Sequence, residues 1–257
     1  TTKPVVKTTK TELDFRMYRS RMSGAYLFGP AGPAVDTEMN LKPLVRCIHG
    51  PLVSEVHVMQ ALVNHTVRIY NASSHLNSGL EVINIVDMRD MDEKELIMHI
   101  DTDIENANGT FYTDQNGLQT MQRRRFQHVP TEANYYPFTT HSFMQDTNTR
   151  LSLLAAQPLG ISSQATGSLE VMLDRRLLYD DRRGLSEGVM DNRPTPSRFF
   201  LLVERPTAES LSKPPPHPLL SHPSLNAELL VEDLRYYSPL YAVSNSDIDI
   251  TEVSGLT

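Results

Sequence analysis

The chain has 257 residues, of which 39% are hydrophobic and 21% are charged, so it holds enough apolar material for a folded core and argues against disorder over its whole length. Its formal net charge of −7 argues against a protein that binds nucleic acid through bulk charge. No apolar run reaches the roughly eighteen residues that a membrane span needs, so no membrane contact is expected within this chain.

The side chains that most often carry metal or redox chemistry are sparse. The single cysteine, Cys47, excludes an internal disulfide and a cysteine-based zinc site. Because Cys47 lies within an expected strand, we predict a small buried apolar residue there rather than a nucleophile. The histidines are scattered without the spacing of metal ligands, so no metal site is expected from this chain.

Alternation of apolar and polar residues dominates the sequence up to residue 205. At residues 12–20 it places Leu13, Phe15 and Met17 on one face of an expected strand. Another strand begins at Phe111 and runs into Asn116-Gly117, the favoured dipeptide of a tight two-residue turn. Further strands are expected at residues 24–28, 45–49, 52–60, 62–70, 79–86, 96–103, 137–143, 150–155, 168–173 and 198–203. Short strands about ten residues apart, without an amphipathic helix among them, predict an all-β fold, an antiparallel β-sandwich.

The composition divides the chain into three parts. Residues 1–205 are expected to form the main β-sandwich domain. Residues 206–223 are rich in proline, which lacks the backbone donor of a regular ladder, and predict a linker or a surface-crossing segment. Residues 224–257, with the apolar run 229–231, are interpreted as the start of a further C-terminal β segment. Both ends look cut, so we expect a piece of a longer polypeptide.

Arg123-Arg124-Arg125 is the sharpest basic cluster of the sequence. One interpretation is a contact to an anion or to nucleic acid. The alternative, which we favour in so acidic a chain, is a solvated strand end whose arginines are paired with carboxylates.

Three sequons for N-glycosylation occur, at Asn64, Asn71 and Asn108. Asn108 lies in a polar turn, whereas Asn64 lies within an expected strand and needs an outward-facing position. Together they favour the lumen of the secretory pathway.

The segment 173–188 carries four acidic and four basic residues around Gly184. Asp180 and Asp181 are candidates for an acid/base pair, but the two carboxylates of a glycosidase normally come from separate elements. From the residues alone we favour a structured, salt-bridged loop.

That segment is similar to the C-terminal half of the family-38 glycoside hydrolases, the retaining α-mannosidases. The resemblance covers roughly residues 12–205, and the form of the motifs is closer to the Golgi-type branch than to the lysosomal one. The motifs that carry it are Glu170–Leu177, Asp180–Leu185 and Gly188–Asn192, preceded in the family's order by Ser23–Phe28, Phe111–Asp114, Asn134–Pro137, Thr149–Leu151 and Gly160–Ser163.

The resemblance implies a galactose-mutarotase-like supersandwich that follows a catalytic α/β domain and a helical bundle. In the family the zinc ligands, the nucleophile and the acid/base carboxylate lie in the N-terminal catalytic part, so neither a catalytic residue nor a metal ligand is assigned to this chain. The implied cofactor is zinc, bound outside the chain. The implied partners are the catalytic domain of the same protein and a mannose-containing N-glycan.

Three residues of this chain are implied as substrate-binding. Tyr26, in the Ser23–Phe28 motif, resembles a tyrosine that reaches into the sugar pocket, where its phenol suits one face of a mannose. Arg183 and Gly184 belong to a loop whose backbone lines the same pocket. The function implied is part of an enzyme that hydrolyses mannose from N-linked glycans in the Golgi lumen. The alternatives are a non-catalytic carbohydrate-binding or structural β-sandwich module, or part of a lysosomal-type α-mannosidase.

Overall fold

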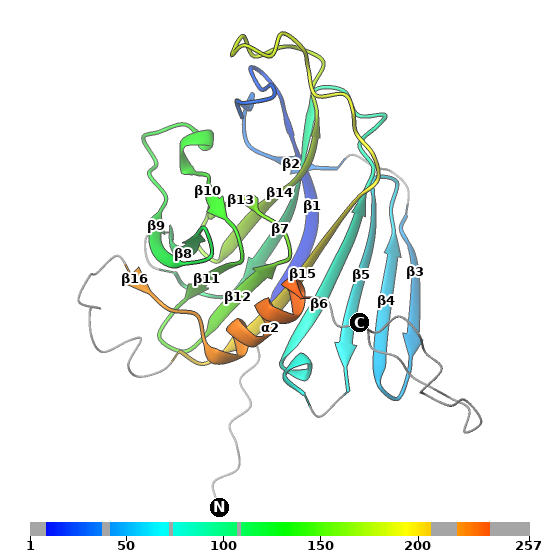
Figure 1. Ribbon diagram of the computed structural model, residues 1–257, viewed down its shortest axis with the longest axis vertical. Coiled ribbons are helices and arrows are strands. Elements are labelled where there is room, and N and C mark those ends of the chain that lie inside the picture. The colour runs from blue at the N-terminus through cyan, green and yellow to red at the C-terminus, as the bar shows by residue number, and fades with distance from the viewer. Residues whose placement is uncertain (1–8, 38–41, 72–73, 107–108, 207–219, 237–257) are drawn as a thin grey trace, which may run out of the picture.

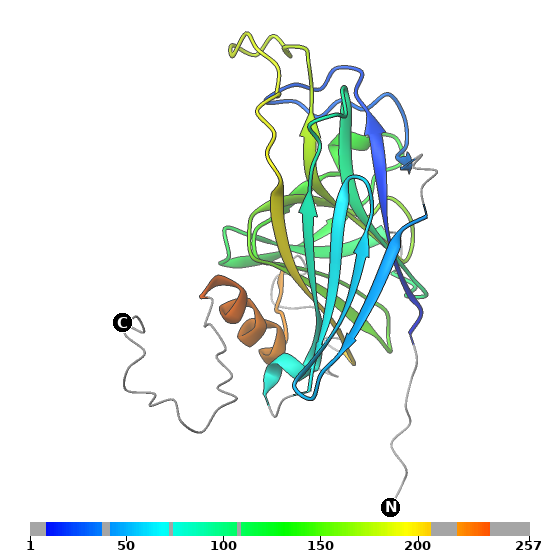
Figure 2. The ribbon, with the colours of Figure 1, turned by 90° about the vertical axis from the view of Figure 1, so that its right-hand side faces the viewer.

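The chain folds into two antiparallel sheets that pack face to face, as the computed structural model shows for residues 9–37, 42–71, 74–106, 109–206 and 220–236 (Figures 1 and 2). The sheets contain six and ten strands. This confirms the all-β antiparallel sandwich that the period-two pattern predicts. In the described part of the chain no helix is long and apolar enough to cross a membrane.

The six-stranded sheet is built around β7 (Lys94–Thr102). Leu96, Met98 and Ile100 of that strand lie in the core between the sheets, and Glu95 and His99 therefore project from the opposite, outer face. In spatial order the sheet contains β10 (Tyr136–Phe138), β13 (Leu159–Ser162), β14 (Ser168–Arg176), β7 (Lys94–Thr102), β1 (Thr11–Arg19) and β2 (Val35–Asp36).

The ten-stranded sheet contributes the other half of the core, through residues such as Val82, Phe111, Leu153 and Phe199. The short 3-10 helix η1 (His75–Ser78) lies in one of its connections, and η3 (Thr131–Asn134) lies in a connection between the two sheets. Its strands are, in spatial order, β16 (Leu220–Ser221), β9 (Gln119–Arg124), β8 (Thr110–Gln115), β11 (His141–Gln145), β12 (Arg150–Ala155), β15 (Thr195–Glu204), β6 (Gly79–Val86), β5 (Val63–Tyr70), β4 (Val53–Met59) and β3 (Leu44–His49).

The predicted turn at Asn116-Gly117 is confirmed, and a buried carboxylate supports it. Asn116 and Gly117 have φ values of 58° and 70°, which a tight turn between β8 and β9 requires. Asp114, fully buried, accepts the N–H of Gly117 at 2.9 Å on one oxygen. Its other oxygen accepts the N–H groups of Thr139, Thr140 and His141 at 2.9, 2.9 and 3.2 Å. One carboxylate therefore fixes two neighbouring turns.

Three expectations about strands are wrong. Residues 24–28 form no strand and belong to a loop, and residues 137–143 are split between β10 and β11. Within the proline-rich segment, β16 does pair with β9. Neither residue of β16 is a proline, since Pro218 precedes the strand and Pro223 follows it, so its backbone donors are available to the ladder.

The strand expected around residues 229–231 is also wrong, because this part of the chain is helix α2 (Leu225–Arg235). Ser224 caps the helix by accepting the N–H of Ala227 at 3.1 Å. Ala227, Leu230 and Leu234 recur at helical spacing and pack, with Val231, on the outer face of the ten-stranded sheet against Leu154, Phe200 and Leu202. The helix therefore adds a layer to the sandwich (Figure 2).

Cys47 is exposed, which overturns the prediction that it is buried. It lies on β3, the edge strand, and every residue of β3 is exposed. The ten-stranded sheet is wider than the six-stranded sheet, so no described element covers β3 at this end (Figure 1).

Replacing Asp114 with Ala is expected to lower the free energy of unfolding by about 3 kcal/mol or more, because several buried N–H groups lose their acceptor. Urea unfolding followed by circular dichroism measures this. Asp103→Ala, at an exposed position, is the matched control and should change stability by less than about 0.5 kcal/mol. Equal stability of the two variants would contradict the role of Asp114.

Candidate functional site

Two loops meet at one end of the sandwich, at the top of Figures 1 and 2. The Tyr26 loop comprises residues 21–29 and follows β1. The Asp181 loop comprises residues 178–188 and follows β14, beginning after the bridge between Leu177 and Val189. Together they contain every residue that the sequence predicts for substrate binding.

The carboxylate of Asp181 connects the two loops. Its Oδ2 accepts the backbone N–H groups of Tyr26 at 2.8 Å and Leu27 at 3.0 Å. Its Oδ1 accepts the N–H of Arg183 at 3.1 Å. Although burial opposes the shift, these N–H groups lower the pKa of Asp181 below its usual value. The carboxylate is therefore an acceptor for backbone groups of both loops.

The close approach of the loops explains Gly24. A Cβ atom there would lie 2.4 Å from the Cβ of Asp181 and 2.8 Å from its backbone nitrogen. Only glycine leaves space for the Asp181 loop at this distance.

Arg175 holds the Tyr26 loop through its carbonyl groups. Its guanidinium donates to the carbonyl of Ala25 at 2.7 Å and to that of Leu27 at 3.1 Å. Asp181 and Arg175 thus bind the N–H and C=O groups of the same short segment. The loop needs no strand partner because these two side chains satisfy its backbone.

A cavity of about 610 Å³ lies beside the Tyr26 loop, on the outer face of the six-stranded sheet. Phe28 packs edge-on against Tyr18 and Tyr135, with ring centroids 5.2 and 5.0 Å apart. Both tyrosine hydroxyls donate to Oε1 of buried Glu170, at 2.5 and 2.7 Å. The cavity is lined by Tyr26, Leu27, Phe28, Glu95, Glu132, Ala133, Tyr135, Leu159, Gly160, Met172, Leu173, Asp174, Arg175 and Val189.

Glu95 is the buried acid of this cavity. It is fully buried, and its Oε2 accepts the hydroxyl of Ser23 at 3.0 Å. Among the described residues its Oε1 accepts no hydrogen bond, and it forms an ion pair with Arg175 Nη1 at 3.8 Å. Burial raises the pKa of Glu95 to about 7. The sequence contains no signal that Glu95 is buried, because it lies in a strand as its neighbours do.

The predicted substrate residues lie at the surface of the two loops. Tyr26 is 65% exposed, and Arg183 and Gly184 are exposed. Tyr26 and Arg183 bind the same carboxylate through their N–H groups, although the sequence gives no local reason for them to meet. Their role in sugar binding stays a prediction.

The interpretation of segment 173–188 as a salt-bridged loop is confirmed for its first part. Arg175 and Arg176 form ion pairs with Glu95 at 3.8 Å and Asp92 at 3.0 Å, and both partners lie outside the segment. Asp181 instead binds backbone N–H groups, so the loop is ordered by hydrogen bonds to a carboxylate.

The sequons remain predictions. Asn64 lies on β5 and is exposed, which is the outward position that its sequon needs. Asn71 is exposed and donates to the carbonyl of Pro51 at 3.1 Å. Asn108 lies outside the described residues.

Residues 1–183 match the family described as glycosyl hydrolases family 38 C-terminal domain. The chain belongs to this family. The match includes the Tyr26 loop and residues 178–183 of the Asp181 loop, so the contact of Asp181 with Tyr26 and Arg183 lies within the family domain.

Curated relatives agree with this assignment. The chain is 44% identical over 204 residues to Alpha-mannosidase 2 of Homo sapiens, which covers 78% of this chain and 18% of that protein. It is 45% identical over 184 residues to Alpha-mannosidase 2 of Drosophila melanogaster, covering 71% of this chain and 16% of that protein. Lysosomal alpha-mannosidase of Homo sapiens is 38% identical over 179 residues, covering 66% and 17%. The chain spans less than a fifth of the length of these relatives.

A solved structure supports the fold. An α-mannosidase from Enterococcus faecalis matches with a TM-score of 0.57 and 11% identity, over 76% of this chain and 25% of that chain. The two-sheet architecture thus recurs at a distance where few residues are shared.

The pH dependence of stability is expected to depend on Glu95. Its pKa is about 7 in the folded chain and near 4.5 when unfolded, so between these values the folded state keeps a proton that the unfolded state loses. The free energy of unfolding therefore falls as the pH rises, by about 2 kcal/mol between pH 5 and pH 7 from this group. Glu95→Gln should remove that loss in urea unfolding at the two pH values. Glu105→Gln, at an exposed position, should behave as the unsubstituted chain does, and an unchanged pH dependence of Glu95→Gln would contradict the assignment.

Proposed function

We propose that this chain is the C-terminal β part of a zinc-dependent, retaining α-mannosidase that removes mannose from N-linked glycans, and that it lines part of the sugar pocket. The observation that carries the proposal is the Asp181 carboxylate, which binds the N–H groups of Tyr26, Leu27 and Arg183. It supports the proposal because the residues implied in sugar binding come from two distant loops and are held together at one exposed place.

In the proposed site Tyr26 offers a hydroxyl and an exposed ring to one face of a mannose. The backbone carbonyls at Arg183 and Gly184 are acceptors for sugar hydroxyls. Asp181 and Arg175 hold the backbone of the Tyr26 loop at both its N–H and C=O groups, so little freedom is lost when the sugar binds. These residues orient the substrate and leave the chemical step to other groups.

The proposed zinc ion does not fit this part of the chain. No group of three or more His, Cys, Asp or Glu side chains among the described residues could hold a metal ion. We therefore assign the zinc ligands, and the two carboxylates of the double displacement, to the catalytic domain of the longer protein. That domain and a mannose-containing N-glycan are the proposed partners.

The proposed location is the Golgi lumen. The higher identity to Alpha-mannosidase 2 than to Lysosomal alpha-mannosidase supports this location over the lysosome, which is the alternative. The sequons at Asn64, Asn71 and Asn108 suit either compartment.

The full-length protein that contains this chain is expected to release mannose from a mannose-bearing N-glycan. NMR of the first-formed product should find the α-anomer, as retention requires. Removal of zinc with a chelator should abolish turnover, and added zinc should restore it. If the full-length protein binds the glycan without any turnover, the chain belongs instead to a non-catalytic carbohydrate-binding module.

In that full-length enzyme, Tyr26→Phe is expected to lower kcat/KM about 2- to 12-fold, the loss of one neutral hydrogen bond of about 0.5–1.5 kcal/mol. The melting temperature should not change, because Tyr26 is 65% exposed. Tyr236→Phe, at a tyrosine that is 69% exposed beyond α2, is the matched control and should keep full activity. Equal activity of both variants would remove Tyr26 from the sugar pocket.

A further inference from the structure

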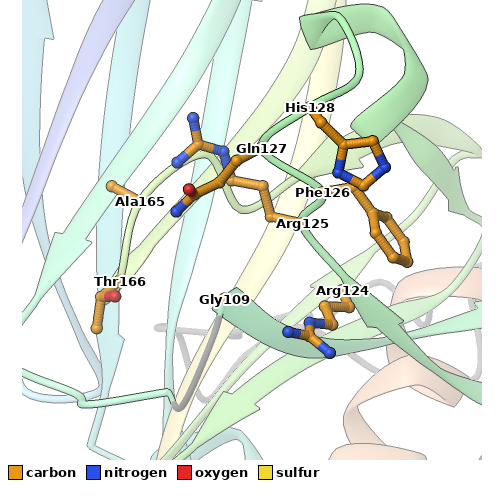
Figure 3. A pocket seen from close by; sticks show the side chains of 8 residues that line it. All are labelled: Gly109, Arg124, Arg125, Phe126, Gln127, His128, Ala165 and Thr166. Carbon is orange, nitrogen blue, oxygen red and sulfur yellow. The ribbon is translucent and has the colours of Figure 1, made fainter.

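A second cavity, of about 580 Å³, opens where the end of β9 meets the turn between β13 and β14 (Figure 3). Arg124 is the last residue of β9, and residues 125–128 form the connection that follows. Its lining residues are Gly109, Arg124, Arg125, Phe126, Gln127, His128, Ala165 and Thr166. They include two arginines, a histidine and no carboxylate, in a chain whose net charge is −7.

The arginine cluster is not paired with carboxylates as the sequence led us to expect. Arg123 donates to the hydroxyl of Thr113 at 3.0 Å, and its guanidinium lies 5.0 Å from the ring centroid of Tyr136. Arg124 and Arg125 form no ion pair within the described part of the chain. The Nε atom of Arg125 is buried and has no hydrogen-bond partner there. A buried guanidinium N–H without an acceptor is costly, so the guanidinium of Arg125 has hydrogen-bonding capacity that the described residues leave unsatisfied.

The wall that carries the arginines is held by a buried amide. Asn134, 2% exposed, accepts the N–H of Phe126 at 2.7 Å and donates to its carbonyl at 3.1 Å. The N–H of Arg125 donates to the carbonyl of Gly109 at 3.3 Å. Gly109 has a φ of 63°, and a Cβ there would lie 3.2 Å from the Cβ of Arg125. The backbone on both sides of Arg125 is thus fixed before any ligand arrives.

A second buried amide holds the opposite wall. Asn106 is fully buried, accepts the N–H of Gly167 at 2.7 Å and donates to the carbonyl of Thr110 at 3.0 Å. Asn106 therefore fixes the turn that carries Ala165 and Thr166 relative to β8. Both walls of the cavity are preorganised, which reduces the entropy that binding costs.

We propose that this cavity binds a tetrahedral oxyanion, a phosphate or sulfate group, through the guanidinium groups of Arg124 and Arg125. Guanidinium N–H groups match the oxygens of such an anion and bond to them more strongly than to a neutral hydroxyl. The amide of Gln127 and the hydroxyl of Thr166 supply further donors. The anion is either free or carried as an ester on a sugar, and the chemistry of recognition is the same for both.

Isothermal titration of the full-length protein at constant ionic strength tests the proposal with inorganic phosphate as the probe. Saturable binding at one site is expected. Arg125→Gln should weaken it at least about tenfold, because two charge-assisted hydrogen bonds are lost. Arg46→Gln is the matched control, since Arg46 is an exposed arginine on β3, and it should bind as the unsubstituted protein does. Mannose 6-phosphate and mannose distinguish the two sources of the anion. If the ligand is a sugar ester, mannose 6-phosphate binds more tightly than inorganic phosphate; if the ligand is a free anion, it does not. Mannose alone should not compete with phosphate in either case.

If Arg125→Gln does not fold, as its circular dichroism spectrum would reveal, Arg124→Gln and Arg125→Lys replace it. Both should weaken phosphate binding. Arg125→Lys keeps the positive charge, so it should weaken binding less than a substitution that removes the charge. The proposal is overturned if phosphate does not bind saturably or if chloride displaces it equally well. It is also overturned if folded variants of Arg124 or Arg125 bind as the unsubstituted protein does, or if Arg46→Gln weakens binding as much.

Discussion

A single carboxylate determines how two loops are arranged at one end of the sandwich. Asp181 binds the N–H of Tyr26, 155 positions away in the chain, and the N–H of Arg183 beside it. Hydrogen bonds to an ionised acceptor are among the stronger ones in proteins, and here they replace a strand partner for the Tyr26 loop. Gly24 leaves the space that this contact needs, and Arg175 binds the carbonyl groups of the same loop.

The same principle recurs within the sandwich. Asp114 accepts N–H groups from two turns, Glu170 accepts the hydroxyls of Tyr18 and Tyr135, and Asn134 holds the wall of the arginine-lined cavity. Each of these side chains is buried. An antiparallel sandwich leaves many loop N–H groups without ladder partners, and a buried acceptor satisfies several of them at once.

Most of the strands could be predicted from the sequence, because the period-two pattern has a direct physical cause in the burial of one face. The pattern predicted the wrong structure where an interaction other than the burial of one face determines the backbone conformation. Residues 24–28 are apolar, as a strand would be, but their backbone groups form hydrogen bonds with Asp181 and Arg175 and not with a neighbouring strand. The sequence of helix α2 contains two helix signals, a serine cap and apolar residues at helical spacing. The apolar run 229–231 was interpreted as a strand, so these signals were missed. The burial of Glu95 and the lack of a partner for Arg125 Nε among the described residues are not visible in a sequence, since both depend on which distant residues surround them.

The open edge at β3 has a practical consequence for how this protein can be studied. Cys47 is the single thiol of the chain, and it is exposed on a strand that no described element covers. A maleimide dye or spin label can therefore be attached there without mutagenesis, far along the sheet from the buried core. Its reactivity in this chain, compared with that in the longer protein, reports whether the rest of the polypeptide shields this end of the sheet.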